Sequence, residues 1–526
     1  MTAEALLHPE EGFPDTQYTN GACSASYKIA PTTIESSTAD PSKGAREEGI
    51  LSLEGPYDRL LGDTEENWCR AIAGGTGITV LGVLFSQQLD PSLLQLAVDV
   101  VQLNHPRLRS ELIWIQGKPA FRVSNNPCVN IEVLDETGSE ESLATNNTDF
   151  EHAKTTENGN AENMEKSEAE GRSWLTLIET ELNTNLWHEK EIHSLEGMKV
   201  FVVRLHHLPG NRSLVTLRVH TATCDRVSAA TVLRDILKAF VNIRKGKGKE
   251  EKNSSMKLMS VEAAIPPGKA NKPFWAHGID LLGYSLGSKW HALLPFEEPC
   301  MPRQTRLIRS SLSFEHTQAL LQACSNAKTS LYGAMCAAGL KAAATLKELG
   351  NRSEHFAIVT LVDCRQYLDP VLSDSTVGFY HSALMNTHHL NEMAEFWELA
   401  RRCSDSLNNA IKNRKHFTDM GDLNYLMYQA IMHPNLTPSN SLRTSLLVAF
   451  KDTMTDNLKE VTDALGVEDY VGCSSIHGVG PSLAIFDSIR NGQLCCANVY
   501  PYPLHSHSQM QTLVNTMMDN LIKFIA

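Results

Sequence analysis

The sequence has no long apolar run, no paired-cysteine motif and no excess of basic charge, and each absence excludes a class of protein. No stretch approaches the roughly 20 apolar residues of a membrane-spanning helix. The twelve cysteines include no C-x-x-C pair, so we expect reduced, mostly buried thiols and neither a zinc site nor a disulfide framework. Acidic residues outnumber basic ones by 61 to 47, which argues against a general nucleic-acid binder.

The beginning of the sequence lacks a basic start followed by an apolar block, so no secretory signal is predicted and the expected location is cytoplasmic. No motif requires a metal or a tightly bound cofactor. An apolar content of 42% and a charged content of 21% are typical of a soluble globular protein, and 526 residues can hold two to three domains. We expect a monomer that does not span a membrane.

Changes in composition along the chain predict its domains. Residues 1–52 are rich in Ser, Thr, Gly, Pro and Glu, which indicates a disordered tail. A first lobe is expected over 53–242, with a flexible acidic insertion at 136–171. Residues 243–303 are predicted to be a linker and crossover, and a second lobe follows over 304–526. Both halves mix strands and helices, so the predicted fold class is α+β, with a mixed sheet and flanking helices in each lobe.

The stretch from Leu214 to Phe240 is predicted to be a strand, a short polar loop and a helix. His220 ends the strand, and Asp225 lies where a helix would be capped. A histidine can accept a proton near neutral pH, and a nearby aspartate can orient its ring, so this loop is a candidate for general-base chemistry. The alternative is a buried histidine that only forms hydrogen bonds within a strand. Arg365 follows Asp363 at the end of another predicted strand, where an internal ion pair is expected.

Four segments, in this order, resemble the acyltransferase superfamily of non-ribosomal-peptide condensation domains, phthiocerol dimycocerosyl transferases, alcohol acetyltransferases and plant BAHD acyltransferases. GDTE at 62–65 is similar to its LG-x-x-E opening, and 89–112 is similar to its helix ending in H-P-x-L-R. Residues 217–237 resemble its H-H-x-x-x-D-G segment, and 362–384 resemble its segment containing an arginine and a later glycine. The resemblance covers about residues 53–526 without the acidic insertion.

The resemblance implies two chloramphenicol-acetyltransferase-like lobes around a central tunnel, with an acyl donor entering from one face and an acceptor from the other. It implies that the second histidine of the motif is the general base, and that the aspartate is structural and pairs with an arginine of the second lobe. By position, His220 is the first histidine and Thr221 replaces the second. Asp225 is the aspartate, Arg226 replaces the glycine, and Arg365 is the partner arginine.

Thr221 has no group that accepts a proton at neutral pH, and this leaves two hypotheses. In the first, the protein transfers an acyl group from an acyl-CoA co-substrate to a hydroxyl or amine of a small metabolite. Thr221 then lines the site, and His220 or a bound water accepts the proton. In the second, the protein is catalytically inactive and uses the same fold to bind a ligand or to serve as a scaffold.

Overall fold

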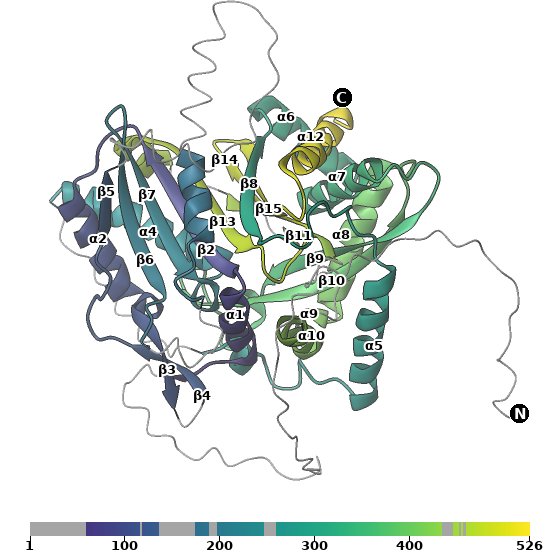
Figure 1. Cartoon of the computed structure of the whole chain (residues 1–526), viewed down its shortest axis with the longest axis horizontal. Coiled ribbons are helices and arrows are strands. Elements are labelled where there is room, and N and C mark those ends of the chain that lie inside the picture. Colours follow the sequence, from purple (N-terminus) through teal and green to yellow (C-terminus); the bar gives the residue numbers. More distant parts are fainter. Residues whose placement is uncertain are drawn as a thin grey trace, which may run out of the picture. The chain divides into compact units, whose positions relative to one another are not determined.

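The computed structural model describes residues 59–115, 118–135, 174–188, 197–246, 259–433, 445–451, 454–455 and 459–525. The predicted tail and the acidic insertion lie outside these residues. From Arg59 onward, the described residues belong to one compact unit. Within it, two larger sheets lie beside each other, and a small three-stranded sheet is built from strands β1 (Arg59–Leu60), β4 (Lys118–Val123) and β3 (Ser110–Ile115) (Figure 1).

The first larger sheet contains the strand that precedes the candidate site. Its order is β13 (Val467–Ile476), β2 (Thr76–Phe85), β7 (Arg212–His220), β6 (Phe201–Leu208) and β5 (Glu132–Asp135). Strand β2 is buried at every position because it lies between β13 and β7 and is covered on both faces. One face packs against helices α2 (Pro91–Asn104) and α4 (Arg226–Arg244), and the other packs against the helix at 174–183.

We call the first larger sheet with its helices the first half of the molecule, and the second larger sheet with its helices the second half. The predicted helix starts in the first half are confirmed. The Asp90 carboxylate accepts a hydrogen bond from the Ser92 amide and caps α2, while Pro91 occupies the first turn. Asp225 caps α4 by accepting from the Ser228 amide at 2.8 Å. The strand–loop–helix predicted over 214–240 is therefore present, as β7, a short turn and α4.

The second larger sheet has the order β10 (His381–Leu390), β9 (Glu354–Asp363), β11 (Ser445–Phe450), β14 (Leu483–Arg490), β15 (Gln493–Tyr502) and β8 (Gln304–Ser311), and β12 (Met454–Thr455) pairs with β14. Strands β14 and β15 form the predicted hairpin at Asn491 and Gly492, which have the positive φ values of 49° and 78° that such a turn requires.

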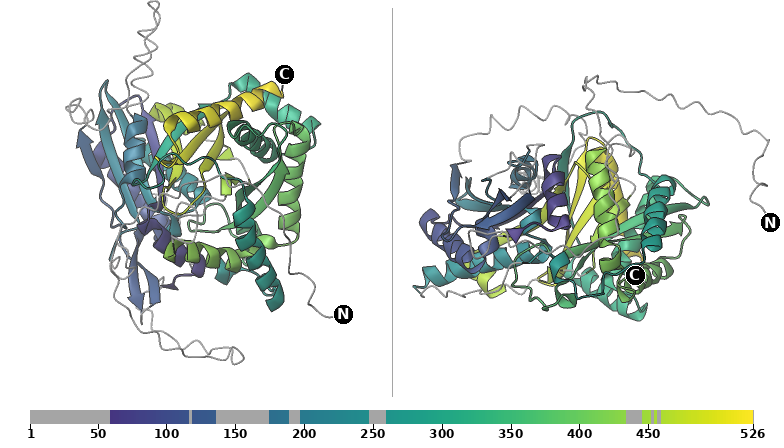
Figure 2. Two further views of the ribbon diagram at one scale, coloured as in Figure 1. Left: turned by 45° about the vertical axis from the view of Figure 1, so that its right-hand side comes forward. Right: turned by 90° about the horizontal axis from the view of Figure 1, so that it is seen from below.

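Helices pack against the second sheet and form a core with it. The core contains α7 (Leu331–Leu346), α8 (Phe396–Lys412) and α12 (His507–Lys523), and Figure 2 shows the yellow helix α12 lying across the yellow strands. The remaining helices of this half are α6 (Phe314–Asn326), α9 (Lys415–Thr418), α10 (Met420–Met432) and α11 (Lys459–Leu465).

The chain crosses between the two larger sheets twice in its last part. Strand β13 follows β12 and α11 in sequence, yet it pairs antiparallel with β2 of the first sheet, and the chain then returns to the second sheet as β14. Segments far apart in sequence thus share one sheet, and they bring the end of β7 close to the second half. This is the arrangement that positions the candidate site.

The stretch at 243–303 contains more structure than the linker and crossover that the sequence predicts. Helix α4 continues to Arg244, and α5 (Phe274–Trp290) forms a helix of 17 residues. Glycines at 278, 283 and 287 lower helix propensity and conceal α5 in the sequence. Among the described helices, none is long and apolar enough to cross a bilayer. The described cysteines are free thiols, and most are buried.

Candidate active site between the two halves

His220 ends β7 and is sealed in the core of the first half. It has no exposed surface, and its ring lies edge-on to Trp187 with the centroids 5.1 Å apart. Its Nδ1 accepts a hydrogen bond from the Ala222 amide at 3.1 Å, so the proton of the neutral ring is on Nε2, which has no partner among the described residues. Burial lowers the pKa of His220 to about 3, so the ring is neutral and weakly basic near pH 7.

Thr221 holds two buried hydrogen bonds instead of presenting a free hydroxyl. Its Oγ1 donates to the Gly77 carbonyl at 2.6 Å and lies 2.8 Å from Thr79 Oγ1. Because a hydroxyl has a single proton, Thr79 must be the donor in the second bond. The Thr221 side chain thus ties the loop to β2. The proton-accepting role predicted for His220, with Thr221 lining the site, stays a prediction, and the burial of both residues speaks against it.

Asp225 and Arg365 form the ion pair that the resemblance implied. Arg365 Nη2 lies 2.9 Å from Asp225 Oδ2, and both side chains are about 1% exposed. Arg365 also donates to Ser228 Oγ at 2.8 Å and to Asp363 Oδ1 at 2.9 Å. The Tyr380 amide donates to Asp225 Oδ2 at 2.8 Å. These contacts join the start of α4 to the ends of β9 and β10, across the two halves.

Asp225 and Arg365 lie at the junction between the two halves, and each keeps its charge because of its partners. Burial by itself would raise the pKa of Asp225, but Arg365 and His381 outweigh that effect and hold the pKa well below its usual range. Burial would lower the pKa of Arg365, and the carboxylates of Asp225 and Asp363 raise it instead. The pair therefore stays charged, and it forms a rigid connection rather than a group that exchanges protons.

Arg226, at the position of the family glycine, also bridges the two halves. Its guanidinium lies over the Phe450 ring, 4.2 Å from the centroid. One nitrogen lies 3.4 Å from the Asp487 carboxylate of β14 and also donates to the Asp487 carbonyl. This bulky, charged side chain takes space that a glycine would leave open beside the loop.

His381 is a residue at this junction that the sequence analysis did not single out. It is the first residue of β10, it is 5% exposed, and its Nδ1 lies 3.2 Å from Asp225 Oδ2. The segment that contains it, VGFYHSAL, is part of the family resemblance. The signal that could have found His381 is the antiparallel pairing of β10 with β9, which places it opposite Asp363 and two residues from Arg365.

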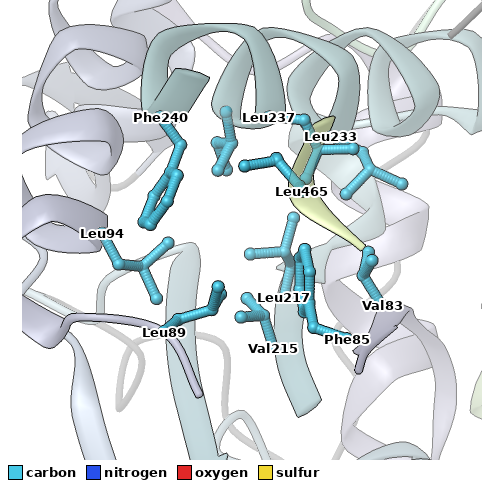
Figure 3. A pocket seen from close by; sticks show the side chains of 11 residues that line it. Val83, Phe85, Leu89, Leu94, Val215, Leu217, Leu233, Leu237, Phe240 and Leu465 are labelled. Carbon is cyan, nitrogen blue, oxygen red and sulfur yellow. The ribbon is translucent and has the colours of Figure 1, made fainter. Parts of the chain in front are cut away.

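Two further features of the described residues are separate from this junction. An apolar cavity of about 10 Å³ lies in the core between α4 and the first sheet, beside Val215, Leu233 and Phe240, and it is too small for a substrate (Figure 3). Asp280, Asp419 and Asp422 have a spacing that could suit a metal. The ammonium of Lys272 lies among them, 2.5 to 3.0 Å from all three carboxylates, and supplies the positive charge itself.

Comparison with known proteins places this arrangement in a known fold. Residues 301–430 match the family model described as the C-terminus of phthiocerol/phthiodiolone dimycocerosyl transferase. The matched range contains Arg365 and His381, and it does not reach the loop after β7. No curated protein sequence matches this chain.

Several solved structures share the fold over most of the chain. Polyketide synthase associated protein 5 from Mycobacterium tuberculosis is similar at a TM-score of 0.59 and 15% identity, over 89% of this chain and 98% of that one. The trichothecene 15-O-acetyltransferase from Fusarium sporotrichioides gives 0.61 and 11%, over 89% and 95%. The epimerization domain from the third module of tyrocidine synthetase B gives 0.57 and 14%, over 89% and 96%.

The family match in the second half and the fold of the whole described chain confirm the resemblance to the superfamily of condensation domains and acyltransferases. The α+β fold class with two lobes is confirmed as well. The similar structures include an acetyltransferase and an epimerization domain, so the fold alone does not define the reaction. A central tunnel stays a prediction.

Proposed function

We propose that this protein transfers an acyl group from a thioester, with acyl-CoA as the expected donor, to a hydroxyl or amine of a small metabolite. The observation that supports this most is the buried ion pair between Asp225 and Arg365, which joins the loop after β7 to the second half in an acyltransferase fold. Such a pair fixes the geometry of the junction, and positioning of two reactants can supply a large part of the rate of a bimolecular reaction.

Aromatic side chains around the junction also support an acyl substrate. The Trp68 and Phe379 rings are 5.6 Å apart, and the Phe450 and Phe486 rings are 5.1 Å apart. These rings come from α1 (Asp63–Ala73), the segment before β10, β11 and β14, so they belong to both halves. An apolar acyl group would gain favourable contact with such side chains, while its thioester lies near the polar residues of the loop.

The second candidate is a catalytically inactive protein that binds a thioester or another ligand on the same fold. It is favoured by the burial of His220 and by the hydrogen bonds that occupy Thr221, because the motif loop then contains no accessible base. The first candidate transfers an acyl group, whereas the second only binds a ligand or serves as a scaffold.

The experiment that tests the proposal measures free thiol release from a panel of acyl-CoA thioesters of increasing chain length. The purified full-length protein is incubated with a mixture of amine and alcohol acceptors, and acylated products are identified by mass spectrometry. Transfer with any donor supports the proposal. Thioester binding by calorimetry without any transfer supports the inactive candidate.

A Thr221→His variant tests whether the fold is ready for chemistry. General-base catalysis contributes typically about 10²–10⁴-fold to a rate. If the junction binds both substrates, restoring an imidazole at position 221 should raise turnover. A variant that folds and binds thioester, yet shows no gain, would indicate that the missing imidazole is not what limits the reaction.

A further inference from the structure

His381 lies on the opposite side of the junction from the motif loop, at the start of β10. Strand β10 pairs with β9 so that His381 is directly across from Asp363, and Figure 1 shows the two strands side by side. The His381 side chain is nearly buried, and its Nδ1 lies 3.2 Å from Asp225 Oδ2. The aspartate that caps α4 therefore faces an imidazole that belongs to the other half.

The surroundings of Asp225 decide which nitrogen of His381 carries the proton. Asp225 accepts hydrogen bonds from Arg365 and from the Ser228 and Tyr380 amides, so it remains an anion. An anion facing Nδ1 favours the tautomer with the proton on Nδ1, which leaves a lone pair on Nε2. Apart from this contact with the carboxylate, Nδ1 has no hydrogen-bond partner among the described residues. The carboxylate thus faces one nitrogen of the ring, and in this tautomer the other nitrogen can accept a proton.

The rings around His381 connect it to both halves. The His381 centroid is 6.2 Å from that of Phe379 and 6.1 Å from that of Phe450. Phe379 in turn contacts Trp68 of α1. Gly77 lies next to both Trp68 and Thr221, because a Cβ built on this glycine would be 3.0 Å from the Trp68 ring and 3.4 Å from the Thr221 side chain. This series of contacts runs from the motif loop to His381, so the imidazole is part of the junction that surrounds Thr221.

We propose that His381 is the proton acceptor of the transfer reaction, in place of the imidazole that the motif lacks at Thr221. This inference rests on the proposed function and names a residue for it. The acceptor hydroxyl or amine gives its proton to His381 Nε2 as its oxygen or nitrogen forms a bond to the thioester carbonyl carbon. The carbon–sulfur bond then breaks, and the leaving sulfur takes the proton from Nε2, which returns the ring to its neutral form. Asp225 is a positioning residue that holds the ring and stabilises its positive charge.

The test compares His381→Gln with His388→Gln, using the donor and acceptor pair that the wild-type protein turns over. His388 is a matched control because it is also a buried histidine of β10, and its side chain is 3% exposed. We expect kcat/KM to fall by about 10²–10⁴-fold in His381→Gln, which is the range for loss of a general base. The control should stay within about threefold of the wild type. Thermal unfolding of both variants confirms that they fold.

A His381→Ala variant provides a second measurement that a purely structural role would not affect. Free imidazole added to this variant should restore part of the transfer rate in proportion to its concentration, and it should not change the rate of His388→Gln. If the wild-type protein transfers acyl groups while His381→Gln keeps its rate and imidazole has no effect, the role of His381 is overturned and acyl transfer stands. If the folded wild-type protein transfers no acyl group from any thioester, both proposals are overturned.

Discussion

The two sides of the junction each contain a buried histidine, and the two are buried in opposite ways. His220, on the first side, lies against Trp187 and a backbone amide, and no charged group from the described part of the chain perturbs it. His381, on the second side, faces the carboxylate of Asp225. Burial without a counter-charge opposes protonation of His220. The histidine of the expected motif therefore lies in surroundings that do not suit proton transfer, while the histidine that faces a carboxylate comes from the other half.

This comparison also shows that the junction depends on Asp225 more than on the motif histidine. The same carboxylate caps α4, pairs with Arg365 and faces His381. Removing His220 would change the packing of one half, while removing a partner of Asp225 would leave a buried charge between the two halves.

Replacing Arg365 should have the largest effect. Arg365→Met removes the cation and leaves the carboxylate of Asp225 buried and unpaired, which typically costs about 3–5 kcal/mol of the free energy of unfolding. Urea denaturation at pH 7 measures this cost. The exposed Arg352 provides the control, since Arg352→Met should change stability by about 0.5 kcal/mol or less. Equal effects of the two variants would contradict the ion pair.

The pH dependence of the same variant follows from the lowered pKa of Asp225. A carboxyl group whose pKa is lower in the folded state than in the unfolded state stabilises the protein above its unfolded value, near 3.9. That stabilisation is lost as the pH falls through the folded value. In Arg365→Met this contribution should be absent, so the loss of stability between pH 5 and pH 3 should be smaller than in the wild type.

The burial of His220 predicts a second effect of pH on stability. It arises from a group that burial keeps neutral, and not from one that a partner keeps charged. Its folded pKa of about 3 lies below the unfolded value of about 6.5, so on acidification the unfolded chain takes up a proton that the folded chain does not. Stability should therefore fall by about 2 kcal/mol between pH 7 and pH 5 through this residue alone. His220→Leu should remove that part of the slope, and His316→Leu at an exposed position should not.

If His220→Leu keeps the wild-type pH slope, the ring is not sealed as described, and its role as a base must be considered again. Thiol release measured on the same samples completes the comparison. A large loss of transfer in a folded His220→Leu variant would favour His220 over His381 as the proton acceptor.

Much of this fold could be predicted from sequence because its signals are local. The cap at Asp90, the helix after Asp225 and the turn at Asn491 each depend on residues a few positions apart, and all three are present. The pairing of Asp225 with Arg365 spans 140 positions, and only the family resemblance indicated it. Position along the chain could not show which side chains are buried.

The parts that sequence reasoning missed depend on contacts between distant segments. His381 is notable because its ring faces Asp225. Arg226 bridges the two halves because it contacts Asp487 and Phe450, which lie on other strands. Strand β13 joins the first sheet although it follows most of the second in sequence. None of these contacts leaves a periodic pattern or a turn signal. A helix such as α5 was hidden for a different reason, its glycine content.

Removing the hydroxyl of Thr221, on the first side of the junction, should have a smaller effect on stability. Thr221→Val removes the donor to the Gly77 carbonyl and leaves that buried acceptor unsatisfied, which should cost about 1–2 kcal/mol of stability. Thr221→Ser keeps the hydroxyl and should lose less. Denaturation of the two variants in parallel measures the difference, and equal losses would show that the methyl group and not the hydrogen bonds holds this loop.

The smallest effect concerns the bridge formed by Arg226 and Asp487, and it tests whether the two halves are coupled away from the central ion pair. Stabilities of Arg226→Ala, Asp487→Asn and the double variant give a coupling energy, which we expect to be about 1 kcal/mol, within the range for residues in contact. Arg226 also covers the Phe450 ring, so Arg226→Ala should lose more stability than the coupling alone. Additive effects of the two single substitutions would mean that Arg226 contributes through the ring and not through Asp487. The two halves would then be joined electrostatically at Asp225, and the space beside the motif loop could be opened by substituting Arg226 without weakening that connection.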